Sequence, residues 1–446
     1  METIFAECSA KGKAGVTVFR ISGPSSYASL QKLIQSNLSN MEARKMYFRK
    51  IYDPFNDDII DEAMVVFFND GASFTGEKVV EIFVHGSIAV VKKLYTALTK
   101  IDTLRLAEPG EFAKRAFLNG KFDLTAAEAL ADLIDAETEL QHKQAIRQLG
   151  GGLERIYDSW RGELVKLIAF IEAYIDFPDE EIPDEALANC KKIIKDLILQ
   201  IKVHLGDSRR GERLRTGIKL AIIGRPNVGK SSLLNYLMQR EVAIVSGIAG
   251  TTRDVIEGHL DIGGYPIILQ DTAGINEITE DLIEIEGIKR AKKVSLEADI
   301  KILMFDIAVA ADIPWQDFAE IIDENTIILL NKIDLIDRPI TDNIKGLTPI
   351  LLSLKTQAGT KELLAEIERI AANLAEPGDL PAITRARHRA QLERAVESLK
   401  AVDFTGDLVL AAEDLRMTIR YLSNITGKIT VDEILGEIFG NFCIGK

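Results

Sequence analysis

Apolar residues recur with two different periods along the chain, and the change of period divides it into regions. Up to about residue 118, short alternating runs are mixed with helical stretches, and turn sequences such as Ser22-Gly23-Pro24 separate them. This mixture predicts an α+β domain over residues 1–118. Its expected strands are 16–21, 63–68 and 79–84, and its expected helices are 26–35 and 88–98.

From residue 119 to 215 the pattern becomes helical. Apolar residues step by three and four positions along one helix face, at Leu153, Ile156, Trp160, Leu164, Leu167 and Ile171. The sequence Asp176-Phe177-Pro178 ends this helix, and a further helix is expected from about 183 to 205. After Pro377-Gly378 the chain becomes helical again up to residue 439.

Residues 216–374 alternate between apolar runs of strand length and helical segments. Such runs are typical of a buried parallel sheet with crossover helices. Two helical blocks, 119–215 and 375–446, therefore flank an α/β domain at 216–374. We expect one all-α helical domain into which the α/β domain is inserted, since insertion is tolerated where chain ends lie close together. Two separate small helical domains are the alternative. The expected strands are 219–223, 267–269, 300–305, 326–330 and 350–352.

Composition narrows the class of protein. The length of 446 residues predicts about three domains, and an apolar content of 47% is ordinary for a soluble globular protein. A net charge of −14 argues against non-specific binding of phosphate through bulk charge. The three cysteines, Cys8, Cys190 and Cys443, form no C-x-x-C pair, which is typical of a reducing compartment. Without a secretory leader or a membrane-length apolar run, we expect a cytoplasmic protein with no membrane association.

One segment in the middle of the chain carries phosphate-binding chemistry. Residues Gly224 to Ser231 match G-x-x-x-x-G-K-[ST], and an expected strand precedes them while a helix follows. In that context backbone N–H groups and the helix N-terminus point at phosphate. Lys230 would supply charge to the β- and γ-phosphates, and the Ser231 hydroxyl would bind magnesium. The alternative is a plain glycine turn into a helix.

Two later segments indicate which nucleotide the first segment binds. Asp271-Thr272-Ala273-Gly274 follows a strand, where Asp271 can reach magnesium through water and the Gly274 N–H can approach the γ-phosphate. Asn331-Lys332-Ile333-Asp334 lies at the end of a strand, and Asp334 can accept hydrogen bonds from guanine N1–H and N2–H₂. The order and spacing of the three segments predict a guanine-nucleotide hydrolase; a P-loop ATPase is a further hypothesis.

Other nucleotide contacts follow from position. Residues 250–254 lie between the first helix and the second strand, and Thr252 is the expected second magnesium hydroxyl. The segment Ser353-Leu354-Lys355 is expected to close the base pocket with a backbone N–H. The expected nucleotide-binding residues are Asn227, Val228, Gly229, Lys230, Ser231, Ser232, Gly250, Thr251, Thr252, Asp271, Thr272, Ala273, Gly274, Asn331, Lys332, Asp334, Ser353, Leu354 and Lys355. A family resemblance, stated below, adds Ser246, Gly247, Ile248 and Ala249.

The residue after Gly274 departs from Ras-like enzymes, which place a glutamine nearby to orient the attacking water. Here Ile275 and Asn276 follow, and the apolar side chain of Ile275 cannot hold water. Another residue must do so, or hydrolysis is slow. The nearby acidic residues are either candidates for this role or a solvated helix face: Glu277, Glu280, Asp281, Glu284 and Glu286.

Over essentially its whole length the chain closely resembles the bacterial tRNA-modification GTPase family, called MnmE or TrmE. The resemblance is carried by Arg20-Ile21-Ser22-Gly23, Ser73-Phe74-Thr75-Gly76-Glu77, Pro109-Gly110-Glu111-Phe112, residues 115–121, residues 176–181 and the C-terminal Phe442-Cys443-Ile444-Gly445-Lys446. It implies a multidomain α/β fold with an N-terminal α+β folate-binding and dimerisation domain, an all-α helical domain, and an inserted P-loop (Ras-like) GTPase domain.

The resemblance also implies a reaction. The family adds an aminomethyl-type group, such as carboxymethylaminomethyl, to carbon 5 of the wobble uridine of certain tRNAs. It acts as a homodimer in a heterotetramer with the flavoprotein MnmG (GidA), and a 5-formyl or methylene tetrahydrofolate supplies one carbon. Matching folate contacts are Arg20, Glu81, Lys121 and Lys446, a charge set that suits an anionic glutamate tail and pterin N–H donors.

The family's GTPase domains meet across potassium, and this chain matches the ligand set. Asn227 corresponds to the potassium ligand, while Ser246, Ile248 and Thr251 correspond to the loop that caps the ion. Glu284 aligns with the glutamate that orients the hydrolytic water, which makes it the expected catalytic residue in place of the missing glutamine. Cys443 matches a cysteine implicated in the modification, as a nucleophile or as a residue that shapes the site.

Two alternatives remain at this level. A regulatory GTPase that binds a ribosomal or RNA partner without modification chemistry would need no folate, so the set Arg20, Glu81, Lys121 and Lys446 distinguishes the two functions. A basic cluster at Arg385, Arg387, His388 and Arg389 is either an RNA contact or, as we expect, a salt-bridged helix face.

Overall fold

The computed structural model describes the chain except for residues 1, 178–182, 240–257, 271–296, 309–317, 319, 337–345, 377, 379, 430, 431, 441, 444 and 446. Contacts divide it into two compact units. The first unit comprises residues 1–131, 149–165 and 419–446, and the second comprises 132–148 and 166–418. Helices α6 (Gly152–Asp176) and α13 (Leu408–Thr426) therefore contribute to both units.

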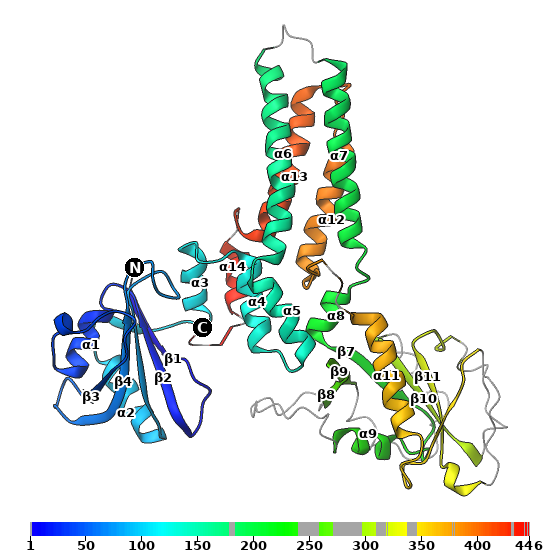
Figure 1. Cartoon of the computed structure of the whole chain (residues 1–446), viewed down its shortest axis with the longest axis horizontal. Coiled ribbons are helices and arrows are strands. Elements are labelled where there is room, and N and C mark those ends of the chain that lie inside the picture. Colours follow the sequence, from blue (N-terminus) through cyan, green and yellow to red (C-terminus); the bar gives the residue numbers. More distant parts are fainter. Residues whose placement is uncertain are drawn as a thin grey trace. The chain divides into compact units, whose positions relative to one another are not determined.

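A six-stranded mixed sheet organises the N-terminal part of the first unit (Figure 1). The strand order is β3-β4-β5-β2-β1-β6, with β1 and β6 parallel and the other neighbours antiparallel. The expected strands are present within β2, β4 and β5, whereas β1, β3 and β6 were not expected. The strands are β1 (Thr3–Glu7), β2 (Ala14–Ser22), β3 (Tyr47–Tyr52), β4 (Ile59–Phe68), β5 (Val79–Gly86) and β6 (Leu104–Leu106).

The two faces of this sheet have different partners. Helices α1 (Ser26–Ile34) and α2 (Ile88–Thr99) cover one face, where Leu30 and Leu94 pack with Phe19 and Ile21 of β2. Successive strand residues point to opposite faces. Arg20 therefore faces the other side, where Ile4 and Ala6 of β1 pack with Phe112 of α3 (Glu111–Leu118). A short 3₁₀ turn, η1 (Leu38–Asn40), precedes β3.

A smaller apolar cluster joins α3 to the C-terminal part of the first unit. Ala113 of α3 and Leu124 of α4 (Leu124–Ile134) pack with Leu435 and Phe439 of α14 (Asp432–Gly440) and with Phe442 after it.

Helix α6 is joined to the residues after α13 by an ion pair. The Nζ of Lys428 lies 2.5 Å from both carboxylate oxygens of Asp158. Along α6, Leu153, Trp160, Leu164, Leu167 and Ile171 are buried as expected. The expectation for Ile156 is wrong: its neighbour Tyr157 is buried instead, and Ile156 is half-buried.

The second unit contains a six-stranded sheet in the order β12-β11-β10-β7-β9-β8. All neighbours are parallel except the β8–β9 hairpin, and the expected parallel sheet is confirmed. Strands buried on both faces explain its continuous apolar runs: Leu220 of β7 belongs to one core, and Ala221 belongs to the other. The strands are β7 (Ile218–Ile223), β8 (Gly258–Ile262), β9 (Tyr265–Leu269), β10 (Ile300–Asp306), β11 (Thr326–Asn331) and β12 (Ile350–Leu352).

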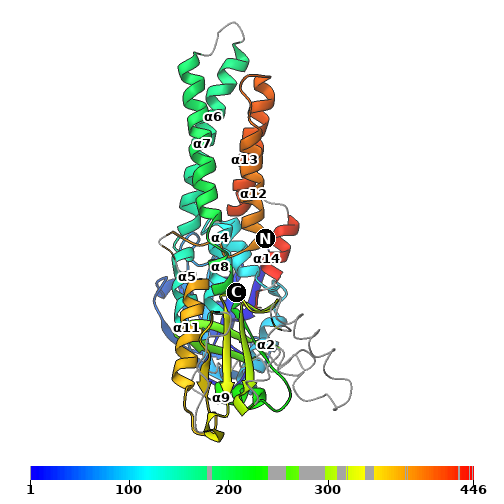
Figure 2. The same ribbon diagram turned by 90° about the vertical axis from the view of Figure 1, so that its right-hand side faces the viewer.

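Helices surround this sheet and extend beyond it. Helices α9 (Lys230–Met238) and α11 (Thr360–Ala375) pack in the same core through Leu233 and Ile367. Helix α7 precedes the sheet in the chain and α12 follows it, yet the two pack against each other (Figure 2). On this basis we propose the domain boundaries expected from the sequence, with residues 119–215 and 375–446 forming one helical domain. The remaining elements are α5 (Glu139–Leu149), α7 (Asp184–Leu205), α8 (Arg210–Thr216), α12 (Ala386–Ala401) and η5 (Ile333–Leu335).

Within the described ranges, none of the helices is both long enough and apolar enough to span a bilayer. The same ranges hold no group of three or more His, Cys, Asp or Glu side chains placed to bind a metal.

Candidate functional site

The loop between β7 and α9 has the geometry of a phosphate cradle. Gly229 precedes the first residue of α9 with φ +108°, a backbone conformation that favours glycine. A side chain there would also come within 2.5 Å of the Asn331 amide nitrogen. The Nζ of Lys230 donates to the carbonyl oxygens of Gly224 and Arg225, both at 2.8 Å, and burial lowers the pKa of Lys230. The loop amides and the positive end of the α9 dipole thus share one small volume with an ammonium group.

The Asn331–Asp334 segment is fastened to that loop. Asn331, the last residue of β11, is buried and donates from Nδ2 to the Val228 carbonyl oxygen at 2.8 Å. Lys332 follows with φ +68° and donates to an Asp306 carboxylate oxygen at 2.7 Å. Burial of Asp306 favours its neutral form, but the Lys332 contact outweighs this and lowers the pKa of Asp306. The Asn331–Asp334 segment and the β7–α9 loop are therefore joined by a side-chain hydrogen bond.

Asp334 lies on the 3₁₀ turn η5 with its carboxylate oriented by a neighbour. The hydroxyl of Ser353, a fully buried residue, donates to Asp334 Oδ1 at 2.7 Å. The Ser353 N–H donates to the Ala358 carbonyl oxygen, and the Thr356 N–H donates to the Ser353 hydroxyl oxygen. The backbone N–H of Ser353 is thus already used within its own turn. The Ser353 hydroxyl bond to Asp334 was not predicted from the sequence, and Leu354 and Lys355 continue the same turn.

Several expected site residues fall outside the described part of the chain. They are Ser246, Gly247, Ile248, Ala249, Gly250, Thr251, Thr252, Asp271, Thr272, Ala273, Gly274, Glu284 and Lys446, together with Ile275 and Asn276. Ser231 and Ser232 lie in the first turn of α9, and Asn227 lies in the loop with φ +62° and is exposed.

A second group of expected residues meets in the first unit. Arg20 of β2 and Glu81 of β5 are direct cross-strand partners. The Nε and Nη2 atoms of Arg20 lie 2.9 and 2.8 Å from the same Glu81 oxygen, so one oxygen of the carboxylate remains for another donor. The guanidinium also stacks on two rings, with its carbon 5.2 Å from the Phe74 ring centre and 5.5 Å from that of Phe112. Each side chain of the pair keeps less than a fifth of its surface exposed (19% and 17%).

The loop that carries Phe74 is held by ion pairs and hydrogen bonds from α3 and the residues after it. The sequence patterns did not predict these contacts. Buried Arg115 pairs with Glu77 at 3.0 Å and with Glu111 at 2.9 Å. Asn119 donates to the Thr75 carbonyl oxygen at 2.7 Å, and Lys121 donates to the carbonyl oxygen of Gly71. Lys121 therefore lies against the loop that also places Phe74 over Arg20. Residues 73–77 and 115–121, two of the segments that carry the resemblance, therefore contact each other here.

Comparisons with known proteins cover the whole chain. A model of the family described as "GTP-binding protein TrmE N-terminus" matches residues 3–121, and one described as "MnmE helical domain" matches residues 124–443. A tRNA modification GTPase MnmE from Rickettsia canadensis (strain McKiel) is 56% identical over 450 residues, and one from Rickettsia bellii (strain RML369-C) is 56% identical over 447; both matches cover 100% of each chain. The chain belongs to the tRNA modification GTPase MnmE family.

A solved structure, the G domain of the T. maritima FeoB iron transporter, is 30% identical over 34% of this chain and 98% of that one, with a TM-score of 0.25. Membership of the MnmE family confirms the fold class expected from the sequence: a TrmE N-terminal domain, an MnmE helical domain and a P-loop GTPase domain. It also confirms that the chain is a GTPase of tRNA modification.

The basic cluster on α12 of this MnmE chain is part of an ion-pair network. Arg385 contacts Asp132 at 2.6 Å, and Arg389 contacts Asp207 at 2.6 Å and Glu212 at 2.8 Å. The salt-bridged face expected from the sequence is confirmed for these two arginines. Arg389 also donates to the Leu205 carbonyl oxygen, so α12 is joined to the chain between α7 and α8.

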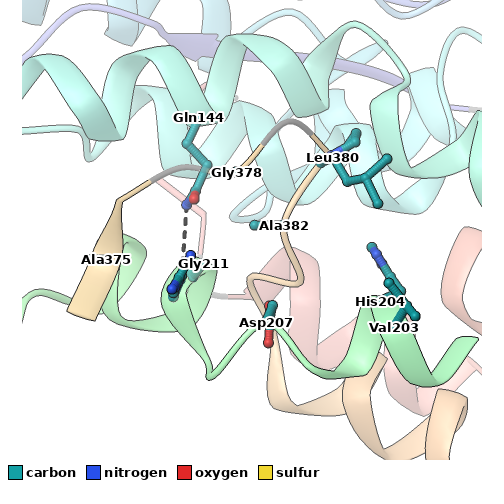
Figure 3. Close-up of a pocket in the computed structure, with 11 residues that line it drawn as sticks. Gln144, Val203, His204, Asp207, Gly211, Ala375, Gly378, Leu380 and Ala382 are labelled. Carbon is teal, nitrogen blue, oxygen red and sulfur yellow. Dashed lines mark hydrogen bonds between the residues drawn. The ribbon is translucent and has the colours of Figure 1, made fainter. Parts of the chain in front are cut away.

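A pocket of about 300 Å³ in the second unit lies between α5, the α7–α8 segment and the chain that follows α11 (Figure 3). Gln144 of α5 bridges to the Gly211 carbonyl oxygen of α8 at 3.2 Å along its edge. His204 at the end of α7 is only 5% exposed, and burial lowers its pKa to about 4. The pocket is lined by Gln144, Val203, His204, Asp207, Arg210, Gly211, Ala375, Gly378, Leu380, Pro381 and Ala382.

The depressed pKa of His204 predicts a loss of stability in mild acid. Below pH 6.5 the histidine of the unfolded chain binds a proton that the buried, neutral His204 does not. The free energy of unfolding is therefore independent of this group above pH 6.5 and decreases as the pH falls toward 4. The loss approaches about 3 kcal/mol, because each unit of pKa shift corresponds to 1.36 kcal/mol. The Asp207 charge acts in the opposite direction, whereas Arg389 and His388 reinforce the shift.

Urea unfolding between pH 8 and pH 4.5 measures this effect. The wild-type midpoint is expected to fall more steeply with acid than that of His204→Gln, which keeps a polar side chain without the titration. Parallel pH profiles for the two proteins would contradict the assignment.

Proposed function

We propose that this protein hydrolyses GTP to drive the addition of an aminomethyl-type group to carbon 5 of the wobble uridine of certain tRNAs. Support comes first from its full-length similarity to tRNA modification GTPases. The observation that carries the GTPase part is the bond between Asn331 and Val228, because it joins the base-reading segment to the phosphate loop. Asp334, held by Ser353, would accept from guanine.

For hydrolysis we assign roles to residues of this site. Lys230 would turn from its loop carbonyls to the β- and γ-phosphates, while the hydroxyls of Ser231 and Thr252 would bind Mg²⁺. Asn227 would offer its amide oxygen to K⁺, which suits an exposed side chain on the loop. Ser246, Ile248 and Thr251 would complete the K⁺ shell. Glu284 would orient the attacking water.

For the modification we propose a tetrahydrofolate site in the N-terminal domain, in the 5-formyl or methylene form. Its residues are Arg20, Glu81, Lys121 and Lys446. Two observations support this group: the Phe74 and Phe112 rings lie against the Arg20 guanidinium, and within the described residues one Glu81 oxygen accepts no hydrogen bond and is available to an N–H donor. When bound, the folate would supply the one-carbon unit. Cys443, which is exposed, would act as a nucleophile or shape the site.

We further propose that the active form is a cytoplasmic homodimer, assembled with the flavoprotein MnmG into a heterotetramer that acts on tRNA. The test is nucleoside mass spectrometry of tRNA from cells that lack this protein and from the same cells carrying it on a plasmid. The modified wobble uridine should disappear in the first and return in the second. If it persists without the protein, a regulatory GTPase becomes the better account.

A further inference from the structure

The C-terminal tail contacts the N-terminal part of the first unit through Phe442, Cys443 and Gly445. Phe442 is buried and lies 5.6 Å from the Phe439 ring, in the cluster that contains Ala113 of α3. The Cys443 carbonyl oxygen accepts from the Gly110 N–H, at the start of α3, at 3.4 Å. The tail is thus attached to the helix whose Phe112 ring stacks on Arg20.

Gly445 makes the closest approach of the tail to the rest of the unit. Its φ is +103°, and a Cβ on it would come 2.3 Å from the Glu7 carbonyl oxygen and 3.1 Å from the Cys8 Cα. No real side chain tolerates the first of these distances, because the obstacle is backbone. The fit therefore requires glycine at 445 both for its conformation and for its lack of a side chain.

Cys8 supplies the polar half of this contact. Its thiol donates to the Gly445 carbonyl oxygen at 3.0 Å, and its own N–H is fixed by the Val18 carbonyl oxygen at 2.8 Å. Burial raises the pKa of the Cys8 thiol, which keeps it protonated as a donor. The charges of Arg20, Glu81 and Glu7 act on this thiol. Arg20 pairs across the strands with Ala6, two positions before Cys8, and with Glu81 on its other side, so the tail contact lies two positions along the sheet from that pair.

We propose that Cys8 and Gly445 form a tail latch that holds Cys443 near the Arg20–Glu81 pair. Cys8 is then a positioning residue, which acts through the tail and has no contact of its own with substrate. The latch itself rests on contacts of this chain alone. Its consequence for folate binding and tRNA modification rests on the proposed function.

Thiol labelling tests the latch without any assumption about folate. Full-length protein is treated with N-ethylmaleimide, and labelling of each cysteine is followed by peptide mass spectrometry. In the wild type, exposed Cys443 should react rapidly, half-buried Cys8 slowly and buried Cys190 most slowly. Gly445→Ala should accelerate Cys8 by about ten-fold or more, since the clash and the positive φ both oppose docking. The control Gly440→Ala should not, because nothing lies within 4 Å of that position. An unchanged Cys8 rate in Gly445→Ala would overturn the latch.

A second comparison tests positioning. Cys8→Ser keeps a hydrogen-bond donor and should bind 5-formyltetrahydrofolate as the wild type does, whereas Cys8→Val and Gly445→Ala should bind it about ten-fold more weakly and modify less tRNA. GTP hydrolysis should be unchanged in all three. If labelling shows release of the tail but folate affinity and modification stay normal, the positioning role is wrong. If the wild type itself binds no folate, the proposed folate site fails while the labelling result still decides the latch.

Discussion

Replacing Asp334 by asparagine is expected to change the preferred nucleotide from guanosine to xanthosine triphosphate. Guanine presents two donors, N1–H and N2–H₂, and the Asp334 carboxylate can accept both. An asparagine places an NH₂ against the guanine amino group but matches the carbonyl oxygen that xanthine carries there. Sites that bury such polar groups discriminate by about 10⁴-fold. Values of kcat/KM for GTP and XTP, measured side by side on wild type and Asp334→Asn, give the ratio directly.

Ser353→Ala is the matched control for that experiment. The Ser353 hydroxyl orients the Asp334 carboxylate at 2.7 Å but offers no base contact in our assignment. Its loss should weaken GTP binding about ten-fold, corresponding to one hydrogen bond to a charged group, and leave the preference for guanosine intact. Unchanged guanosine preference in Asp334→Asn would instead show that another residue reads the base.

Exchange of potassium for sodium is expected to slow GTP hydrolysis by on the order of 10³-fold. The proposed K⁺ would occupy the place of an arginine finger, whose contribution spans 10³ to 10⁵. Na⁺ is smaller, so oxygens spaced for K⁺ coordinate it poorly. Steady-state hydrolysis at constant ionic strength, with chloride salts of the two cations, measures the effect. Equal rates in both salts would remove the role proposed for Asn227.

The backbone at Asn227 allows a clean variant. Its φ of +62° is a conformation that alanine adopts with strain, so Asn227→Ala would change both the loop and the ligand. Asn227→Gly keeps that conformation at little cost and removes only the side-chain amide. We expect this variant to hydrolyse GTP slowly and at the same rate in potassium and sodium, while its GTP affinity stays near that of the wild type.

The strands and helix around the proposed nucleotide site were predictable because its motifs lie in short contiguous segments. The strand before Gly224, the helix from Lys230 and the position of Asn331 at a strand end all agree with expectation. The bond from Asn331 to Val228 crosses 103 residues of sequence, and the one from Ser353 to Asp334 depends on a turn. Contacts of this kind are set by tertiary packing, which no local pattern encodes.

The N-terminal domain was harder to predict, for physical reasons. Strand β6 has three residues, and β3 has one buried position in six, so neither shows the alternation of a half-buried strand. Arg20 and Glu81 were identified through resemblance alone. Their pairing follows from the register of β2 and β5, which the sequence does not specify. Cys8 carried no signal at all, because its role depends on a tail 437 residues away.

The chain enters the GTPase domain and leaves it at two neighbouring points. The Arg215 Nε donates to the Thr384 carbonyl oxygen at 2.9 Å, so the points at which the chain runs into the sheet and out of it are neighbours. The GTPase domain can therefore be excised genetically and its flanks rejoined by a linker of a few residues. Leu140 and Leu214, which pack in the GTPase core, would then need polar replacements. The shortened protein would show what the N-terminal and helical parts do without a nucleotide cycle.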